Sequence, residues 1–279
     1  MTISSVGVNG SVQNVTDVPV CTHAEAGHLS QEEYERVLAV LETLQGDDWQ
    51  QPTYCTEWTV RDMVAHLAGS VTGSTSFAEF KRQNVSHPYL KQYANPVDGT
   101  NKLQIEDRAN KVTSELVAEF RQSGQTAVQN RQKLPWIVRK IHLPMGELGF
   151  SSFEYLMDII YPRDQWMHRY DICAATGKKM IVTPQHDGRI IALVLLDINK
   201  KLKKQLHHCT ILLELTGPLT AVYQFGNETT PDCTISMDVF DFNLRASGRI
   251  SMEEVVQRTA VLGDQMIADW FLQNMQVSY

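Results

Sequence analysis

Residues 161–171 read YPRDQWMHRYD, and this segment carries two metal-binding residue types one helical turn apart. If it is helical, Asp164 and His168 lie on one face with Cβ atoms about 5–6 Å apart, close enough for both to bind one small ion. Another histidine, His66, lies much earlier in the chain, in the helix-like run 59–67. The sequence therefore predicts a helical bundle that brings His66, Asp164 and His168 together around a divalent metal.

Four helix-like segments in the first two thirds of the chain are the expected parts of this bundle. The first two open at Ser30 and Thr59 with capping-box sequences, in which a hydroxyl and a carboxylate satisfy free backbone amides. The third spans 103–133, and the fourth spans 151–176 with a glycine directly after it. Pro162 should kink the fourth helix, because proline has no N–H to donate. Four long helices joined by loops are typical of a bundle, whose core can hold a metal.

The pattern of the chain changes after residue 183. An amphipathic helix is expected over 190–206, followed by three short strands separated by Gly-Pro and Gly-Asn turns, at 210–216, 220–225 and 233–237. We therefore expect a flexible N-terminal arm over 1–25, a helical bundle over 26–183 and a smaller α+β domain over 184–279. The predicted fold class is α+β, mainly α.

Composition limits the partners and the compartment. The net charge of −7 argues against a nucleic-acid partner, because phosphate binding needs clustered cations. The five cysteines are scattered and none forms a Cys-x-x-Cys pair, so neither a disulfide framework nor a zinc knuckle is indicated. No apolar run approaches the length of about 18 residues that a membrane helix needs, so no membrane insertion is expected. These features favour a cytoplasmic protein and leave its oligomeric state open.

Two motifs in the expected bundle resemble the mycothiol-dependent maleylpyruvate isomerase family, which belongs to the DinB-like four-helix bundles. The first is P-T-x-C-x-x-W-T-V-R-D-x-x-x-H-L over 52–67, and the second is D-x-x-x-H-x-x-D-I over 164–172. In the last part of the chain, Ser-Gly-Arg at 247–249 and Gly-Asp at 263–264 look like the sterol-carrier-like domain that accompanies this bundle. The first motif is the more specific, since it joins a loop, a cap and a ligand.

The resemblance implies a site and a class of chemistry. It implies a divalent metal, usually zinc, bound at positions that match His66, Asp164 and His168 here. Family members more often have Glu where this chain has Asp164, and the shorter side chain could draw in a water or alter the geometry. The resemblance also implies a low-molecular-weight thiol as co-substrate, with isomerisation or thiol transfer as typical activities.

The donor set agrees with that chemistry. Two imidazoles and one carboxylate suit Zn²⁺ and leave a fourth position for water or substrate. The same set serves Fe²⁺, and affinity alone would not exclude Ni²⁺. A metal deprotonates a coordinated thiol. We expect the resulting thiolate to add to an electrophilic carbon and either leave after bond rotation, which is isomerisation, or remain attached, which is transfer.

Several residues near the expected ligands have two interpretations. Asp62 precedes His66 by one turn and Asp171 follows His168 by about one turn, so each could orient a ligand histidine, replace a ligand at the metal or simply hold the fold. The position of Asp62 in the capping box favours a role at the helix start. Cys55, although it lies in the first motif, is expected to be a buried loop residue, since free cysteines are often buried.

An anionic substrate needs a cationic side chain, and Arg249 is the catalytic candidate for that clamp. It lies between helical segments of the second domain, where it could face the bundle. The alternative is a surface arginine that caps the preceding helix. Arg245 and Arg169 are weaker candidates for the same role.

Three functions remain open at this point. The leading hypothesis is a metal-dependent enzyme that uses a thiol as an isomerase or S-transferase on a small electrophilic substrate. The second is a non-catalytic protein that binds a small apolar molecule or lipid. The third is a metal-dependent hydrolase with bound hydroxide as the nucleophile. No Gly-x-Ser-x-Gly elbow or phosphate-binding glycine loop is present to suggest a serine hydrolase or a nucleotide enzyme.

Overall fold

A computed structural model of the chain describes residues 11–144 and 149–279. The chain forms two compact units. The bundle unit consists of Cys21–Ile181 together with Ser278–Tyr279, and the sheet unit consists of Val182–Val277 with the N-terminal segment up to Val20. Within the described ranges, no helix combines the length and the apolar character that crossing a membrane requires.

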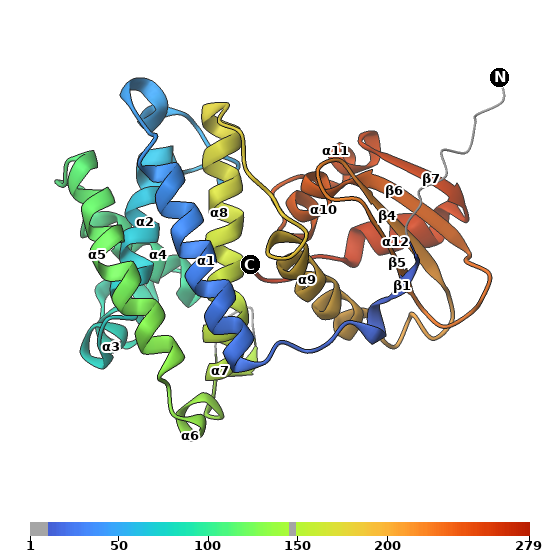
Figure 1. The fold of residues 1–279 in the computed structure, drawn as a ribbon, viewed down its shortest axis with the longest axis horizontal. Coiled ribbons are helices and arrows are strands. Elements are labelled where there is room, and N and C mark those ends of the chain that lie inside the picture. Colours follow the sequence, from blue (N-terminus) through green and yellow to red (C-terminus); the bar gives the residue numbers. More distant parts are fainter. Residues whose placement is uncertain (1–10, 145–148) are drawn as a thin grey trace. The chain divides into compact units, whose positions relative to one another are not determined.

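Four long helices build the bundle unit: α1 (His23–Leu41), α2 (Val60–Gly73), α5 (Thr113–Gln132) and α8 (Tyr161–Thr176). Helix α5 packs against both α1 and α2, and α8 packs against the same two helices (Figure 1). Shorter elements fill the connections: η2 (Gly46–Gln50), α3 (Phe77–Val85), η3 (Pro88–Lys91), α4 (Pro96–Glu106), α6 (Trp136–Arg139), β2 (His142–Pro144), β3 (Phe150–Ser152), α7 (Phe153–Tyr155) and η5 (Leu156–Ile160). Strands β2 and β3 pair as an antiparallel hairpin.

The start of α2 is as predicted, and the start of α1 is not. Thr59 Oγ1 accepts from the N–H of Asp62, and the Asp62 carboxylate accepts from the N–H of Thr59 at 3.0 Å, which completes the capping box. Helix α1 begins instead at His23, where Thr22 Oγ1 accepts from the N–H of Glu25 at 3.2 Å. Ser30 is a buried residue inside α1, so the interpretation of Ser30 as a cap was wrong.

Two further helix predictions differ from the structure. The expected helix over 103–133 is divided between α4 and α5, and Arg108 and Lys111 in the turn between them form ion pairs with Glu119 of α5 at 2.6 and 2.7 Å. The segment before Pro162 is the π-helix η5, and α8 starts at Tyr161. Since Pro162 cannot donate to the preceding turn, a wider turn at this place is consistent with the predicted interruption.

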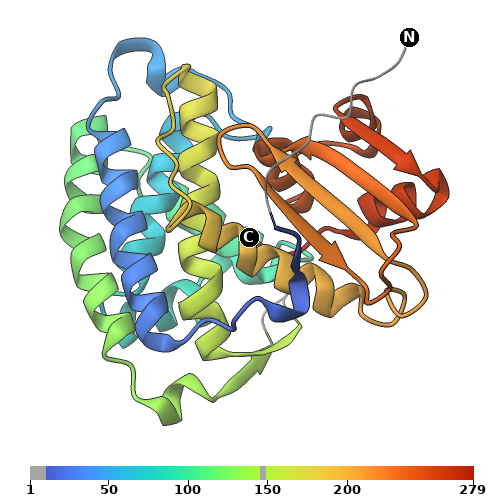
Figure 2. The ribbon, with the colours of Figure 1, turned by 45° about the vertical axis from the view of Figure 1, so that its right-hand side comes forward.

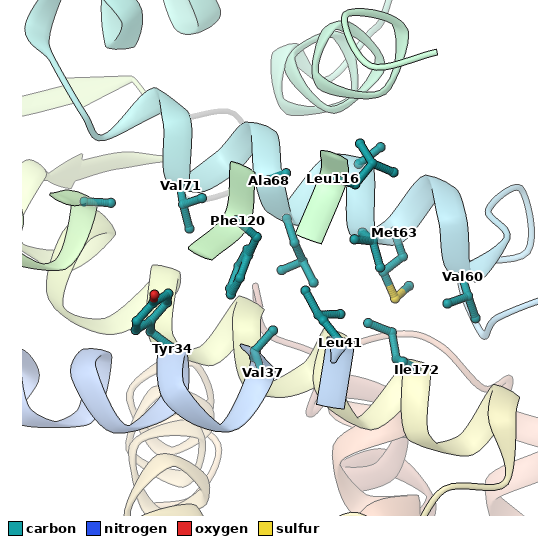
Figure 3. Packing of buried hydrophobic residues seen from close by; sticks show 14 of the residues in the cluster. Tyr34, Val37, Leu41, Val60, Met63, Ala68, Val71, Leu116, Phe120 and Ile172 are labelled. Carbon is teal, nitrogen blue, oxygen red and sulfur yellow. The ribbon is translucent and has the colours of Figure 1, made fainter. Parts of the chain in front are cut away.

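Apolar residues of all four long helices form the core of the bundle unit. Figure 3 shows Tyr34, Val37 and Leu41 of α1 facing residues of α2 and α5, among them Phe120. The Tyr34 ring stacks on Phe120 with centroids 5.6 Å apart. Burial of such side chains is the main favourable contribution to folding, at about 25 cal/mol per Å² of apolar surface. It also fixes the relative positions of α2 and α8, the helices that carry the predicted ligands.

We expect Gly124→Ala to destabilise the bundle unit, because Tyr34 lies directly against this glycine of α5. A Cβ atom at Gly124 would meet Cε2 of Tyr34 at 2.3 Å. Overpacking of this kind costs about 1–3 kcal/mol, more than alanine gains by its helix propensity. The measurement is urea unfolding. Gly188→Ala is the control, since no atom lies within 4 Å of its added Cβ; equal effects of the two changes would contradict this account of the packing.

The sheet unit contains a mixed five-stranded sheet in the order β1-β5-β4-β6-β7. Its strands are β1 (Gln13–Asn14), β4 (Ile211–Thr216), β5 (Ala221–Phe225), β6 (Cys233–Asp238) and β7 (Thr259–Gly263). Strand β4 is antiparallel to β5 and parallel to β6, and its side chains alternate between buried and half-buried because of the pleat. The helices of this unit are α9 (Asp187–Leu202), α10 (Val239–Ala246), α11 (Met252–Gln257) and α12 (Gln265–Asn274). Helices α10 and α12 pack against β6 (Figure 2).

The predicted fold class, α+β and mainly α, is confirmed, and three of the sheet strands lie close to their predicted ranges. The N-terminal segment differs from the expected flexible arm over 1–25. Residues 1–10 lie outside the described residues, but β1 pairs in parallel with β5, and Asn14 Nδ2 donates to the carbonyl oxygen of Gly226 at 3.0 Å. Val15, in the short helix η1 (Val15–Asp17), is fully buried. Residues 13–17 are therefore part of the sheet unit.

Candidate metal centre

The packing of α2 against α8 brings the three predicted ligands together. His168 Nε2 lies 3.2 Å from Asp164 Oδ1, and His66 Nε2 lies 3.7 Å from Asp164 Oδ2. One donor atom from each of the three residues lies within 4.8 Å of the other two. Ligands at 2.0–2.2 Å from a single zinc ion would be separated by distances of this order.

His66 is buried, and its hydrogen-bonding capacity is the next feature of the cluster. Within the described part of the chain, neither ring nitrogen of His66 makes a hydrogen bond. Burial lowers the pKa of His66, so the imidazole is held in the neutral form that binds metals. A buried polar group without a partner costs free energy, and a bound cation would remove that cost for one of the two nitrogens.

His168 is oriented by a neighbour on its own helix. Its Nδ1–H donates to Oδ2 of Asp171 at 3.1 Å, and the Asp171 side chain is fully buried. With Nδ1 held in this way, Nε2 is the nitrogen on the side of Asp164 and the one placed to bind a metal. Asp171 therefore makes the contact to a ligand histidine that the sequence left open, whereas Asp62 caps α2, as favoured from the sequence.

Asp164 supplies the negative charge of the cluster. Burial alone would raise the pKa of Asp164, but the charge and hydrogen bond of His168, with smaller effects from His66, outweigh burial and hold that pKa well below its usual range. The carboxylate is therefore ionised at neutral pH. Two imidazoles and one carboxylate form a donor set that fits a divalent cation with one position left for another ligand.

Trp58 forms an apolar wall beside the two histidines. Its ring centroid lies 5.0 Å from that of His66 and 5.9 Å from that of His168. A backbone bond from Trp58 N–H to the carbonyl oxygen of Cys55, 2.7 Å long, closes the loop that holds it. In the sequence, this tryptophan stood out only as one position of the 52–67 motif. Its place in the 52–67 motif, directly before the cap of α2, is the signal that could have assigned it to the site.

A second donor group overlaps the first. Cys55, His168 and Asp171 also have donor atoms within 4.8 Å of one another. This group includes His168 Nδ1 and the Asp171 carboxylate, which already share a hydrogen bond. The group of His66, Asp164 and His168 has the stronger case, because it contains the buried ring nitrogens that lack partners.

The three candidate arginines have different surroundings. Arg169 donates from Nε and Nη2 to the Glu33 carboxylate at 2.7 and 3.0 Å, and both side chains are buried. Arg245 donates from Nε to the carbonyl oxygen of Leu272 at 2.9 Å. These two are engaged in holding the fold. Arg249 lies in the sheet unit after α10, partly exposed, and its role as a cationic clamp stays a prediction.

Two comparisons with solved structures show the same fold. This chain is similar to mycothiol-dependent maleylpyruvate isomerase and to a histidine-to-alanine mutant of that enzyme, with TM-scores of 0.55 and 0.56. In both cases the sequence identity is 14%, and the match covers 90% of this chain and 95% of the other. No curated protein matches the sequence.

The sequence comparison with protein families concerns the bundle. The family described as the mycothiol maleylpyruvate isomerase N-terminal domain matches residues 30–173, more than half of the chain. The matched range contains α2 and α5 completely, most of α1 and α8, and all three residues of the cluster, His66, Asp164 and His168. The chain thus belongs to the mycothiol maleylpyruvate isomerase N-terminal domain family.

Proposed function

We propose that this protein is a metal-dependent enzyme that uses a low-molecular-weight thiol and acts as an isomerase or S-transferase on a small electrophilic substrate. The observation that carries the proposal is the cluster of His66, Asp164 and His168, in which the buried His66 ring nitrogens have no hydrogen-bond partner among the described residues. The thiol is proposed from the family, which is named for an isomerase that depends on mycothiol.

The proposed metal is Zn²⁺, with Fe²⁺ and Ni²⁺ as the alternatives that this donor set allows. His66 and His168 would supply neutral nitrogens, and Asp164 would supply one negative charge. Bound there, a divalent metal provides a Lewis acid that lowers the pKa of a thiol or water in its coordination shell. The side chain of aspartate is shorter than that of glutamate. The Asp164 carboxylate nevertheless faces both histidines from its position on α8.

The surrounding residues would support this chemistry in distinct ways. Asp171 holds the His168 ring in one orientation and one tautomer. Trp58 covers the histidines with apolar surface, which strengthens electrostatic interactions by limiting water. We keep Arg249 as the proposed clamp for an anionic substrate. The sterol-carrier-like character of the sheet unit is likewise a proposal.

The reaction class follows from the fate of the thiol. Addition of a thiolate to an electrophilic double bond converts that bond to a single bond, around which the adduct rotates. Expulsion of the thiolate restores the double bond in the other geometry, so isomerisation consumes no thiol. If the adduct instead takes up a proton at the neighbouring carbon, the thiol stays attached and the outcome is transfer.

The test combines zinc-loaded protein with mycothiol and maleylpyruvate as probes, and follows both the substrate and the free thiol. Loss of substrate at constant thiol supports isomerisation, and equal loss of both supports transfer. Substrate loss at the same rate without any thiol would contradict the proposal and favour a metal-dependent hydrolase. Bound metal that promotes no turnover of this or other electrophilic substrates would favour the non-catalytic binding protein.

We expect Asp171→Asn to weaken zinc binding by about 10-fold or more, because hydrogen-bond partners of ligand histidines contribute about 10–100-fold to metal affinity. The change keeps the shape of the side chain but removes the negative charge next to His168 Nδ1. Competition with a chelator measures the affinity, and Asp47→Asn, at an exposed position, controls for the loss of one carboxylate. Equal zinc affinities of both variants and the wild type would show that Asp171 only holds the fold.

A further inference from the structure

The bundle unit contains a cavity that the proposed chemistry does not use. It has a volume of about 390 Å³ and lies where α2 and α5 end. Most of its lining is apolar and includes Phe80, Val138, Phe153 and Met157. The three residues of the metal cluster are not part of this lining. Pockets for small molecules typically measure 300–1,000 Å³, so the size suits a bound ligand.

Two cationic side chains line this cavity: Lys133 is exposed, whereas Arg131 of α5 is buried and only 4% exposed. Its Nη1 lies 3.5 Å from Ser74 Oγ, at the limit of a hydrogen bond, and its guanidinium lies over the Tyr161 ring, 5.1 Å from the centroid. Over the described residues, Nε of Arg131 has no hydrogen-bond partner and no carboxylate lies within ion-pair distance of this side chain. Among the residues that the structure describes, Arg131 is thus a buried cation with no carboxylate in direct contact.

The electrostatic balance leaves room for an anion. Burial lowers the pKa of Arg131 to about 10, and the side chain therefore remains protonated near neutral pH. Asp158, whose negative charge acts on Arg131, uses its carboxylate to bind His23 Nδ1 at 2.9 Å. The Tyr161 ring offsets part of the cost of burying the charge, but a cation–π contact is weaker than a charge-assisted hydrogen bond. An anion next to the guanidinium would satisfy the remaining donors.

We propose that this cavity binds an organic monocarboxylate, with its apolar body against Phe80, Phe153 and Met157 and its carboxylate at Arg131. One guanidinium matches a single planar carboxylate in charge and shape. The apolar lining excludes a ligand with a strongly polar body. This site shares no residue with the metal cluster. Binding of a carboxylate here would be a function in addition to the proposed thiol chemistry.

The test compares two probes that differ only in charge, decanoate and decanamide, by calorimetric titration of the full-length, zinc-loaded protein. We expect decanoate to bind at least about 10-fold more tightly, because hydrogen bonds to charged groups are the stronger ones. In Arg131→Met the affinity for decanoate should fall to that for decanamide, whereas Arg121→Met, an exposed change on the same helix, should keep the preference. Val138→Phe retains Arg131 but fills the cavity, and should weaken both probes.

Several results would overturn the proposal. Equal affinities of the wild type for the two probes would remove the role of the cation, and this result does not depend on any variant folding. A decanoate preference that survives Arg131→Met in folded protein would place the carboxylate elsewhere. The carboxylate could instead bind the metal; in that case decanoate binding would disappear in metal-free protein and in His168→Ala, whereas our proposal predicts that both retain it.

Discussion

Replacing His168 with alanine is expected to remove bound zinc and to lower any thiol-dependent turnover by more than about 100-fold. Loss of a hydrogen-bond partner of a ligand already costs about 10–100-fold, and loss of the ligand itself should cost more. Only His66 and Asp164 would remain, and two protein ligands are fewer than the three of a typical catalytic zinc site. Metal content by mass spectrometry and turnover under saturating thiol provide the two measurements.

The matched control for this change is His142→Ala. His142 lies on β2, is exposed, and is absent from every donor group described above. We expect this variant to keep both metal and turnover. If His168→Ala binds zinc as the wild type does, the cluster is not a metal site and the enzyme proposal loses its basis.

Glu33→Ala is expected to destabilise the bundle unit by about 3–5 kcal/mol. Glu33 of α1 and Arg169 of α8 form a two-point ion pair with distances of 2.7 and 3.0 Å, and 0% and 2% of their side chains are exposed. Removing the carboxylate takes away the two-point acceptor of a buried guanidinium, which is the costly way to break such a pair. Urea unfolding measures the free-energy difference.

An exposed ion pair between α1 and α5 provides the control. Arg121 Nη2 lies 2.7 Å from Glu42 Oε1, and the two side chains are 55% and 46% exposed. Since exposed pairs contribute only about 0–1 kcal/mol, Glu42→Ala should change stability little. Equal effects of the two glutamate changes would mean that burial of the Glu33 pair carries no special cost.

The two largest predictions concern His168 and the partner of its neighbour Arg169, and they can be separated by experiment. His168 belongs to the metal cluster, while Arg169 points to a different neighbour, α1. Glu33→Ala should therefore lower stability but leave zinc stoichiometry unchanged in the folded fraction. His168→Ala should instead remove zinc from the folded fraction, because it removes a proposed ligand.

Several local features were predictable because they depend on residues close together in the chain. The capping box of Thr59 and Asp62 places the start of α2, and Gly177, with a φ angle of 66°, ends α8 in the left-handed conformation that glycine tolerates. The four-residue spacing of Asp164 and His168 puts both on one face of α8.

Other features were not predictable from neighbouring residues. Strand β1 forms by pairing with the edge of β5. Strand β7 pairs with β6, although its residues show no clear alternation of buried and exposed side chains. Ser30 has the right sequence for a cap, but the actual cap, Thr22, lies eight residues earlier. Local propensity allows several possible starts and ends for a helix or strand, and long-range packing determines which of them form.

From the sequence alone came the fold class, the family resemblance and the identity of the three candidate ligands, because residue spacing along a helix determines which side chains share a face. Only the tertiary structure decided that His66 meets Asp164 and His168, that Asp171 orients His168, and that Arg131 is buried in the wall of an apolar cavity. These are contacts between distant segments. They depend on how α2, α5 and α8 pack, and that packing is a property of the whole core.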